Sequence, residues 1–121
     1  MDFKELLAYK KSFELAMEIF ELSKTFPKEE RFSLTDQIRR SSRSVSANIA
    51  ESYRKRRYTN HFISKLTDSD AENSETNTWL EFSLECQYIT KETFEKLNIK
   101  SLEIGRLINY VINNPNKFGC G

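Results

Sequence analysis

The side chains of this chain that could do chemistry are mostly charged, and they form two stretches of opposite sign. Residues 33–57 contain seven basic residues and two acids, whereas residues 66–85 contain six acids and no base. Basic side chains can contact phosphates, and carboxylates can pair with them or bind a cation. Because the whole 121-residue chain has a net charge of only +1, any charged partner must be recognised by such local groups.

A basic cluster closes the first stretch, where four consecutive cations have only Glu51 as an acid within four residues. We expect these side chains to reach solvent, and together with one earlier arginine they are the candidate contacts for RNA or DNA: Arg54, Lys55, Arg56, Arg57 and Arg39. Phosphate contacts of this kind weaken as salt rises. The structural alternative is a solvated helix end, where cations interact favourably with the helix dipole. Both interpretations stay open on the sequence alone.

The centres of the two stretches should face each other if the stretches form neighbouring helices. If the chain turns near residues 57–58, the numbers of two residues that face each other add to about 115. Arg43 then lies level with Glu72, and Arg40 level with Glu75. We predict that these four residues form a polar network with Asn48 and Glu51. Such a network fixes helix register within or between subunits, and the alternative is a charged site for a ligand.

The sequence contains little that favours catalysis, with no nucleophile–base pair and no phosphate-binding glycine loop. Glu72 and Glu75 with Asp68 could form a carboxylate metal site, but bundle sites of this kind add Glu-x-x-His pairs, which the chain lacks. The single histidine, His61, is expected in solvent at the start of a helix. We therefore predict no catalytic residue, no metal and no cofactor.

The two cysteines have the spacing of neither a zinc site nor a redox pair. Cys86 is expected to pack as a small apolar residue near a helix end, and Cys120 to be a free, exposed thiol. No apolar run approaches the ~18 residues of a membrane span, and the first residues do not resemble a signal peptide. The expected location is the cytoplasm, without contact to a membrane.

Four amphipathic helices are needed to position these residues. Three glycines and two prolines are few, which favours long helices and short turns. Helical spacing of apolar residues predicts helices over about residues 3–24, 33–56, 59–85 and 90–113. Their predicted core includes Leu34, Ile38, Val45, Ile49, Phe62, Leu66 and Leu80. The natural solution is an antiparallel up-down-up-down four-helix bundle over residues 1–115, followed by a tail over residues 116–121.

The first helix carries two apolar stripes, although one bundle core needs a stripe only about 100° wide. One stripe includes Phe13 and Met17, and the other includes Leu15 and Ile19. Either this is a broad core helix, or one stripe faces another subunit. The second helix has a small, polar middle around Ser41, which predicts a bundle centre that is partly polar.

Three segments of the chain match the pattern of a known family. They are residues 26–32 with Leu34, Gln37 and Arg39-Arg40; Ser44-Val45 with residues 48–51; and Glu75-Thr76 with residues 79–81 and Tyr88-Ile89. In these segments the chain resembles the four-helix bundle proteins named for the 23S ribosomal RNA intervening sequence. Serine stands at positions 33 and 52 where that family often has glycine, at 41 where it has alanine and at 46 where it has proline.

The resemblance implies a closed four-helix bundle assembled as a ring-like homopentamer, in a family without an established enzymatic activity. Related accessory proteins of diversity-generating retroelements form basic pentameric barrels that act with a reverse transcriptase and nucleic acid. This chain is much less basic than those relatives. The prediction is a non-enzymatic homo-oligomer with RNA or DNA as a candidate partner. The alternative is a pure scaffold with an unidentified protein partner and no nucleic acid.

Overall fold

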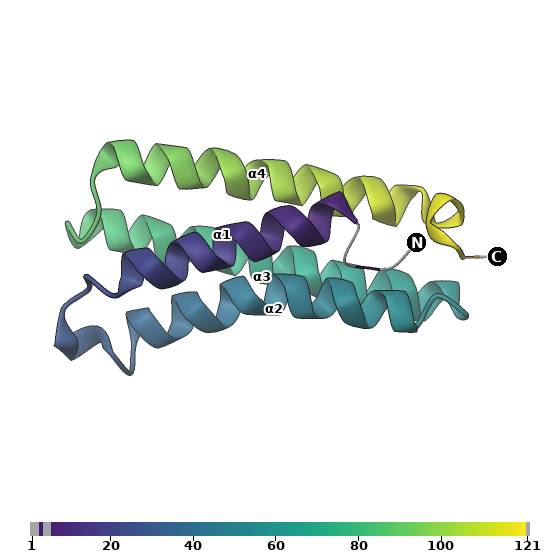
Figure 1. Ribbon diagram of the computed structural model, residues 1–121, viewed down its shortest axis with the longest axis horizontal. Coiled ribbons are helices and arrows are strands. Elements are labelled where there is room, and N and C mark those ends of the chain that lie inside the picture. Colours follow the sequence, from purple (N-terminus) through teal and green to yellow (C-terminus); the bar gives the residue numbers. More distant parts are fainter. Residues whose placement is uncertain (1–2, 4–5, 121) are drawn as a thin grey trace.

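The computed structural model describes residue 3 and residues 6–120, and within that range every regular element is helical. The four α-helices are α1 (Leu7–Ser23), α2 (Leu34–Arg54), α3 (Thr59–Glu85) and α4 (Lys91–Asn113). Two short 3₁₀ helices, η2 (Lys28–Glu30) and η3 (Pro115–Phe118), lie in the first loop and after α4. The α-helices run along the long axis of an elongated bundle (Figure 1). The predicted all-α class is confirmed.

The helix boundaries follow the local signals closely. Helix α3 has the predicted bounds, and Thr90 caps α4 by accepting a hydrogen bond from the backbone N–H of Thr93 at 3.1 Å. Helix α2 ends at Arg54, two residues before the predicted end. Helix α1 begins at Leu7 instead of Phe3; residues 4 and 5 lie outside the described residues.

A glutamate in the first loop caps α2. The spacing of Ser33 and Asp36 in the sequence predicts a capping box at this helix start, and that prediction is wrong. Ser33 makes no side-chain cap bond to the helix. Instead, Glu30 Oε1 accepts hydrogen bonds from the Ser33 hydroxyl at 2.6 Å and from the Leu34 N–H at 3.3 Å. The other Glu30 oxygen accepts from the Tyr88 hydroxyl at 2.7 Å, which joins this loop to the turn between α3 and α4.

The core follows the predicted helical spacing, and each of the seven predicted core residues of α2 and α3 is buried. Ile38, Ile49, Phe62 and Leu80 are fully inaccessible. Helices α1 and α4 complete the core with Leu15, Ile19, Leu97, Ile104 and Ile108.

The middle of the bundle is polar, as the sequence predicts. The Thr76 hydroxyl donates to Ser41 Oγ at 2.8 Å, and the Ser69 hydroxyl donates to the Val45 carbonyl at 2.8 Å. Among the described residues, no buried side-chain nitrogen or oxygen lacks a hydrogen-bond partner. Along α2 the bonded residues are Ser41 and then Val45, and their partners on α3 are Thr76 and then Ser69. Both bonds form together only in this register of α2 and α3.

The last residues fold back onto the bundle. Beyond η3, the Cys120 side chain is only 5% exposed, so the prediction of an exposed thiol is wrong. Cys86, predicted to be packed, is exposed at the C-terminal end of α3. Both cysteines are free. Within the described part of the chain, no helix is long and apolar enough to span a bilayer.

Candidate interaction surfaces

The basic cluster after α2 divides into two kinds of residue. Arg54, Lys55 and Arg57 are exposed, but Arg56 is half-buried. The Arg56 guanidinium donates to the carbonyls of Tyr53 at 2.9 Å and Phe118 at 3.4 Å, and it lies 4.2 Å from the centroid of the Tyr53 ring. The predicted solvent exposure is therefore wrong for Arg56. Because α2 ends at Arg54, the turn directs this side chain back across the helix end to η3.

Two aromatic side chains extend the exposed basic group. Tyr58 is 57% exposed, and its ring lies 5.4 Å from the ring of His61 and 5.8 Å from the Arg57 guanidinium. His61 is exposed, as predicted. Tyr58 was not among the predicted site residues, although its position directly after four cations is the signal for it. We call the exposed group of Arg54, Lys55, Arg57, Tyr58 and His61 the α2–α3 corner.

Arg39 does not belong to this corner. It is half-buried and donates to Ser23 Oγ at 2.7 Å and to the Phe20 carbonyl at 3.4 Å, with its Cζ 4.7 Å from the Phe20 ring centroid. It also lies roughly 22 Å from Arg54 along the α2 axis. The structure therefore gives Arg39 a role in holding α2 against the end of α1.

The predicted pairing of Arg40 and Arg43 with acids of α3 is not formed. Arg40 pairs with Asp36 on its own helix at 3.9 Å, and Arg43 lies with its Cζ 5.5 Å from the Phe20 ring centroid. None of the ion pairs between described residues joins either arginine to Glu72 or Glu75. The Ser41–Thr76 bond agrees with the predicted alignment of α2 and α3 along the bundle. The Arg43 side chain, however, points toward α1 instead of α3.

Other members of the predicted network have different partners. Glu51 and Lys65 form an ion pair between α2 and α3 at 2.8 Å. Their hydrogen bond and charges hold the pKa of Glu51 below its usual value and that of Lys65 above its own. The Asn48 amide donates to the Ser44 carbonyl one turn earlier at 2.9 Å. The α2–α3 contact is thus held by one peripheral ion pair and by the central hydroxyls.

The acids of α3 take part in none of the ion pairs between described residues. Glu75 Oε1 accepts from the Trp79 indole at 3.3 Å. Burial, followed by the charges of Glu75 and Asp68, raises the pKa of Glu72, and the charge of Arg40 only partly opposes this. Over residues 3 and 6–120, no group of three His, Cys, Asp or Glu side chains is arranged to hold a metal ion.

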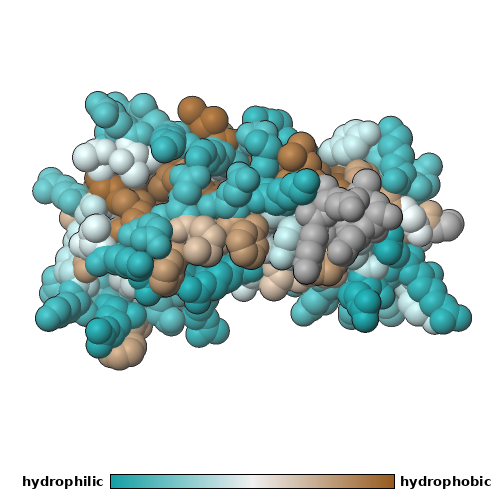
Figure 2. All heavy atoms as spheres, viewed as in Figure 1, coloured by the Kyte–Doolittle hydropathy of each residue, from teal (hydrophilic) through white to brown (hydrophobic). Residues whose placement is uncertain are grey.

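Helix α1 presents apolar side chains to solvent. Phe13 and Met17, here called the α1 ridge, are 50% and 48% exposed, whereas Leu15 and Ile19 of the second stripe are in the core. On the face shown in Figure 2, apolar side chains lie among hydrophilic ones along the middle of the bundle.

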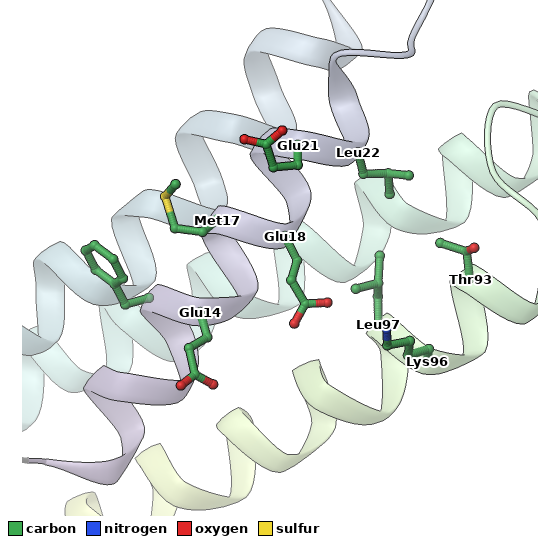
Figure 3. Close-up of a pocket in the computed structure, with 9 residues that line it drawn as sticks. Glu14, Met17, Glu18, Glu21, Leu22, Thr93, Lys96 and Leu97 are labelled. Carbon is green, nitrogen blue, oxygen red and sulfur yellow. The ribbon is translucent and has the colours of Figure 1, made fainter.

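Two hollows flank the α1 ridge and differ in charge. The α1–α4 hollow, of about 870 Å³, is lined by Glu14, Glu18 and Glu21 on α1 and by Lys96 on α4, among other residues (Figure 3). The α1–α2 hollow, of about 400 Å³, has one charged residue among the described residues that line it, Arg43. Its other lining residues are aromatic, apolar or small: Phe3, Tyr9, Phe13, Ala16, Met17, Ser46, Ala47 and Ala50.

Comparison with known proteins agrees with this architecture. The family model of the 23S rRNA-intervening sequence protein matches residues 4–110. The chain belongs to this family. Its fold is similar to the crystal structure of a protein of unknown function from the S23 ribosomal protein family of Bacteroides thetaiotaomicron VPI-5482. That protein is 35% identical, the match covers 88% of this chain and 96% of the other, and the TM-score is 0.79. No protein with a curated description matches the chain.

The family predicted from the three sequence segments is thus confirmed, and the structure explains part of the resemblance. Two residues in those segments, Glu30 and Tyr88, meet at one end of the bundle. The hydroxyls of Ser33 and then Tyr88 lower the pKa of Glu30, and the Glu30 carboxylate raises the pKa of Tyr88 to about 12. In this 23S rRNA-intervening sequence protein, these residues clamp the two loops together.

Replacing Tyr88 by Phe should lower the free energy of unfolding in a pH-dependent way. A lowered carboxyl pKa contributes stability above the ordinary value of 4.5, and this stability is lost as pH falls through the folded value. A raised phenol pKa contributes stability below pH 10.0, the ordinary pKa of tyrosine, and this stability is lost as pH rises toward about 12. Urea unfolding should therefore show the largest difference between native protein and Tyr88→Phe at neutral pH. A difference that stays constant from pH 3 to pH 7 would contradict the clamp.

Proposed function

We propose that this chain is a non-enzymatic structural protein that acts as a homo-oligomer, a side-by-side ring of about five copies. Each copy is an antiparallel up-down-up-down bundle, which the opposed numbering of hydrogen-bonded residues on α2 and α3 supports. The observation that carries the proposal is the exposed α1 ridge between two hollows. Large apolar side chains grouped on a surface mark interaction sites.

The ring and its number of copies rest on the resemblance to the family. The exposed α1 ridge and the two hollows beside it are compatible with such a ring. A copy that contacts its neighbour through two different surfaces makes a head-to-tail contact, which closes into a ring when the rotation allows it. The proposal includes no catalytic step. Among the described residues, the charged ones lining the α1–α4 hollow are three glutamates and a lysine, without a nucleophile beside a base, and the charged one lining the α1–α2 hollow is an arginine.

The test is the mass of the purified protein in solution at micromolar concentration. Light scattering should give about five times 14.3 kDa, and Met17→Glu should reduce the mass because a buried carboxylate has no partner in an apolar contact. Ile99→Glu is the matched control, because Ile99 is 63% exposed on α4, away from the α1 ridge. A native protein that elutes as a clean monomer contradicts the proposal.

A second candidate function is binding of RNA or DNA at the α2–α3 corner. Three exposed cations can contact phosphates, and the exposed Tyr58 ring can stack on an unpaired base. A ring would bring several corners to one rim, and multivalency would turn weak contacts into measurable retention. The remaining alternative is a scaffold for a protein partner.

Retention of a labelled single-stranded RNA at about 50 mM salt tests this second function, and binding should weaken steeply as salt rises. Arg54→Gln, Lys55→Gln and Arg57→Gln together should abolish retention, while Arg56 stays in place to keep η3 anchored. Arg106→Gln is the control, an exposed cation on α4 far from the corner in sequence. If the native protein retains no RNA at this salt concentration, the scaffold function replaces the nucleic-acid one.

A further inference from the structure

The α3 surface has an excess of negative charge beside aromatic rings. Glu72, Glu75, Trp79 and Phe82 follow one another at helical spacing, and we call them the α3 ridge. The Trp79 and Phe82 rings lie 5.8 Å apart, and Phe82 is 53% exposed. Glu72 is half-buried, yet none of the ion pairs between described residues includes it. Glu72 is only partly solvated and has only the charge of Arg40 nearby to offset its own, so a cation supplied by a partner would stabilise it further.

The α1–α2 hollow has the complementary character. Among the described residues that line it, the charged one is Arg43, which is exposed and has the Phe20 ring as its one recorded interaction. Ala47 and Ala50 form part of its floor on α2. Small residues on a helix face let another helix approach closely, and the surrounding aromatic side chains provide apolar area to bury.

We propose that the α3 ridge of one copy docks into the α1–α2 hollow of a second copy, where Arg43 pairs with Glu72 and the aromatic rings pack on the α1 ridge. This interface rests on the proposed homo-oligomer and specifies which two surfaces build it. It also explains why the pair predicted from the sequence is not formed within one chain.

Charge selects this pair of surfaces over the other exposed apolar regions. The α1–α4 hollow carries three glutamates, which would repel an acidic ridge. Beside the exposed Ile99 and Leu102 of α4, the acid Glu103 is already paired with Lys11, so this region offers Arg43 less negative charge than the α3 ridge does. The α3 ridge combines an exposed ring, Phe82, with two acids that take part in none of the ion pairs between described residues, Glu72 and Glu75.

The two surfaces also lie at the same height along the bundle. Arg43 lies midway between the two α2 residues that bond to α3, and Glu72 lies between their partners, Ser69 and Thr76. They lie on different sides of α2, because Arg43 contacts Phe20 of α1, whereas the α2 charge that acts on Glu72 is that of Arg40. Copies can therefore dock side by side without an axial shift. A closed ring around an axis parallel to the bundles requires this, since each step is a rotation without translation.

Charge reversal tests the pairing in the full-length protein. Arg43→Glu and Glu72→Arg should each raise the concentration at which half the oligomer dissociates by at least tenfold, because like charges then face each other across the contact. The double variant should return to within about threefold of the native protein, since the pair is restored in reverse. Arg43→Ala is a milder second variant that removes the cation without placing a carboxylate beside Phe20.

Arg106→Glu is the matched control, the same charge change on α4, and it should leave assembly unchanged. Circular dichroism verifies that each variant keeps its helical content. If the native protein is an oligomer and neither single variant weakens it, this interface is wrong while the proposed function stands. If both singles dissociate and the double variant does not recover, the pairing of Arg43 with Glu72 is overturned. If the native protein is a monomer, the interface and the proposed function both fail.

Discussion

Hydrogen bonds between buried hydroxyls at the centre of the α2–α3 contact are the constraint on which the rest of the structure depends. Thr76 donates to Ser41, and Ser69 donates to a backbone carbonyl of α2. Apolar side chains tolerate small shifts along a helix, but a buried polar group that loses its partner costs about 1–3 kcal/mol. A shift in register would break both bonds at once. The small side chains also let the two helices pack closely, so the most extensive helix contact of the bundle is also its most specific.

The central hydroxyls leave the charged residues free for other roles. Since register does not depend on Arg40, Arg43, Glu72 or Glu75, their side chains occupy the outer faces of the bundle. There Arg43 and Glu75 contact aromatic side chains, and Arg40 pairs with Asp36 of its own helix. The same register that keeps these groups apart within one chain brings Arg43 and Glu72 to equal heights on different faces. In the proposed oligomer, the polar core thereby determines which surfaces two copies bring together.

Sequence patterns were sufficient for the helices, the core and the level of each residue along the bundle, because these follow from helical periodicity and short turns. They were insufficient for the direction of long side chains, which depends on neighbours from other helices. Arg43 turned to the Phe20 ring, and Arg56 turned back to η3. The hydrogen bond between Glu30 and Tyr88 was also missed, because the two residues lie 58 positions apart in the chain. Because Arg56 turns back to η3, nucleic-acid contacts are proposed only for the exposed cations of the cluster, Arg54, Lys55 and Arg57.

The central claim is that the Ser41–Thr76 hydrogen bond helps to fix the register of α2 and α3. A double-mutant cycle with Ser41→Ala, Thr76→Val and the double variant, followed by urea unfolding, measures their coupling most directly. We expect a coupling free energy of about 1 kcal/mol, the typical net contribution of a buried hydrogen bond. Additive single effects, with a coupling indistinguishable from zero, would contradict the claim and assign the register to apolar packing alone.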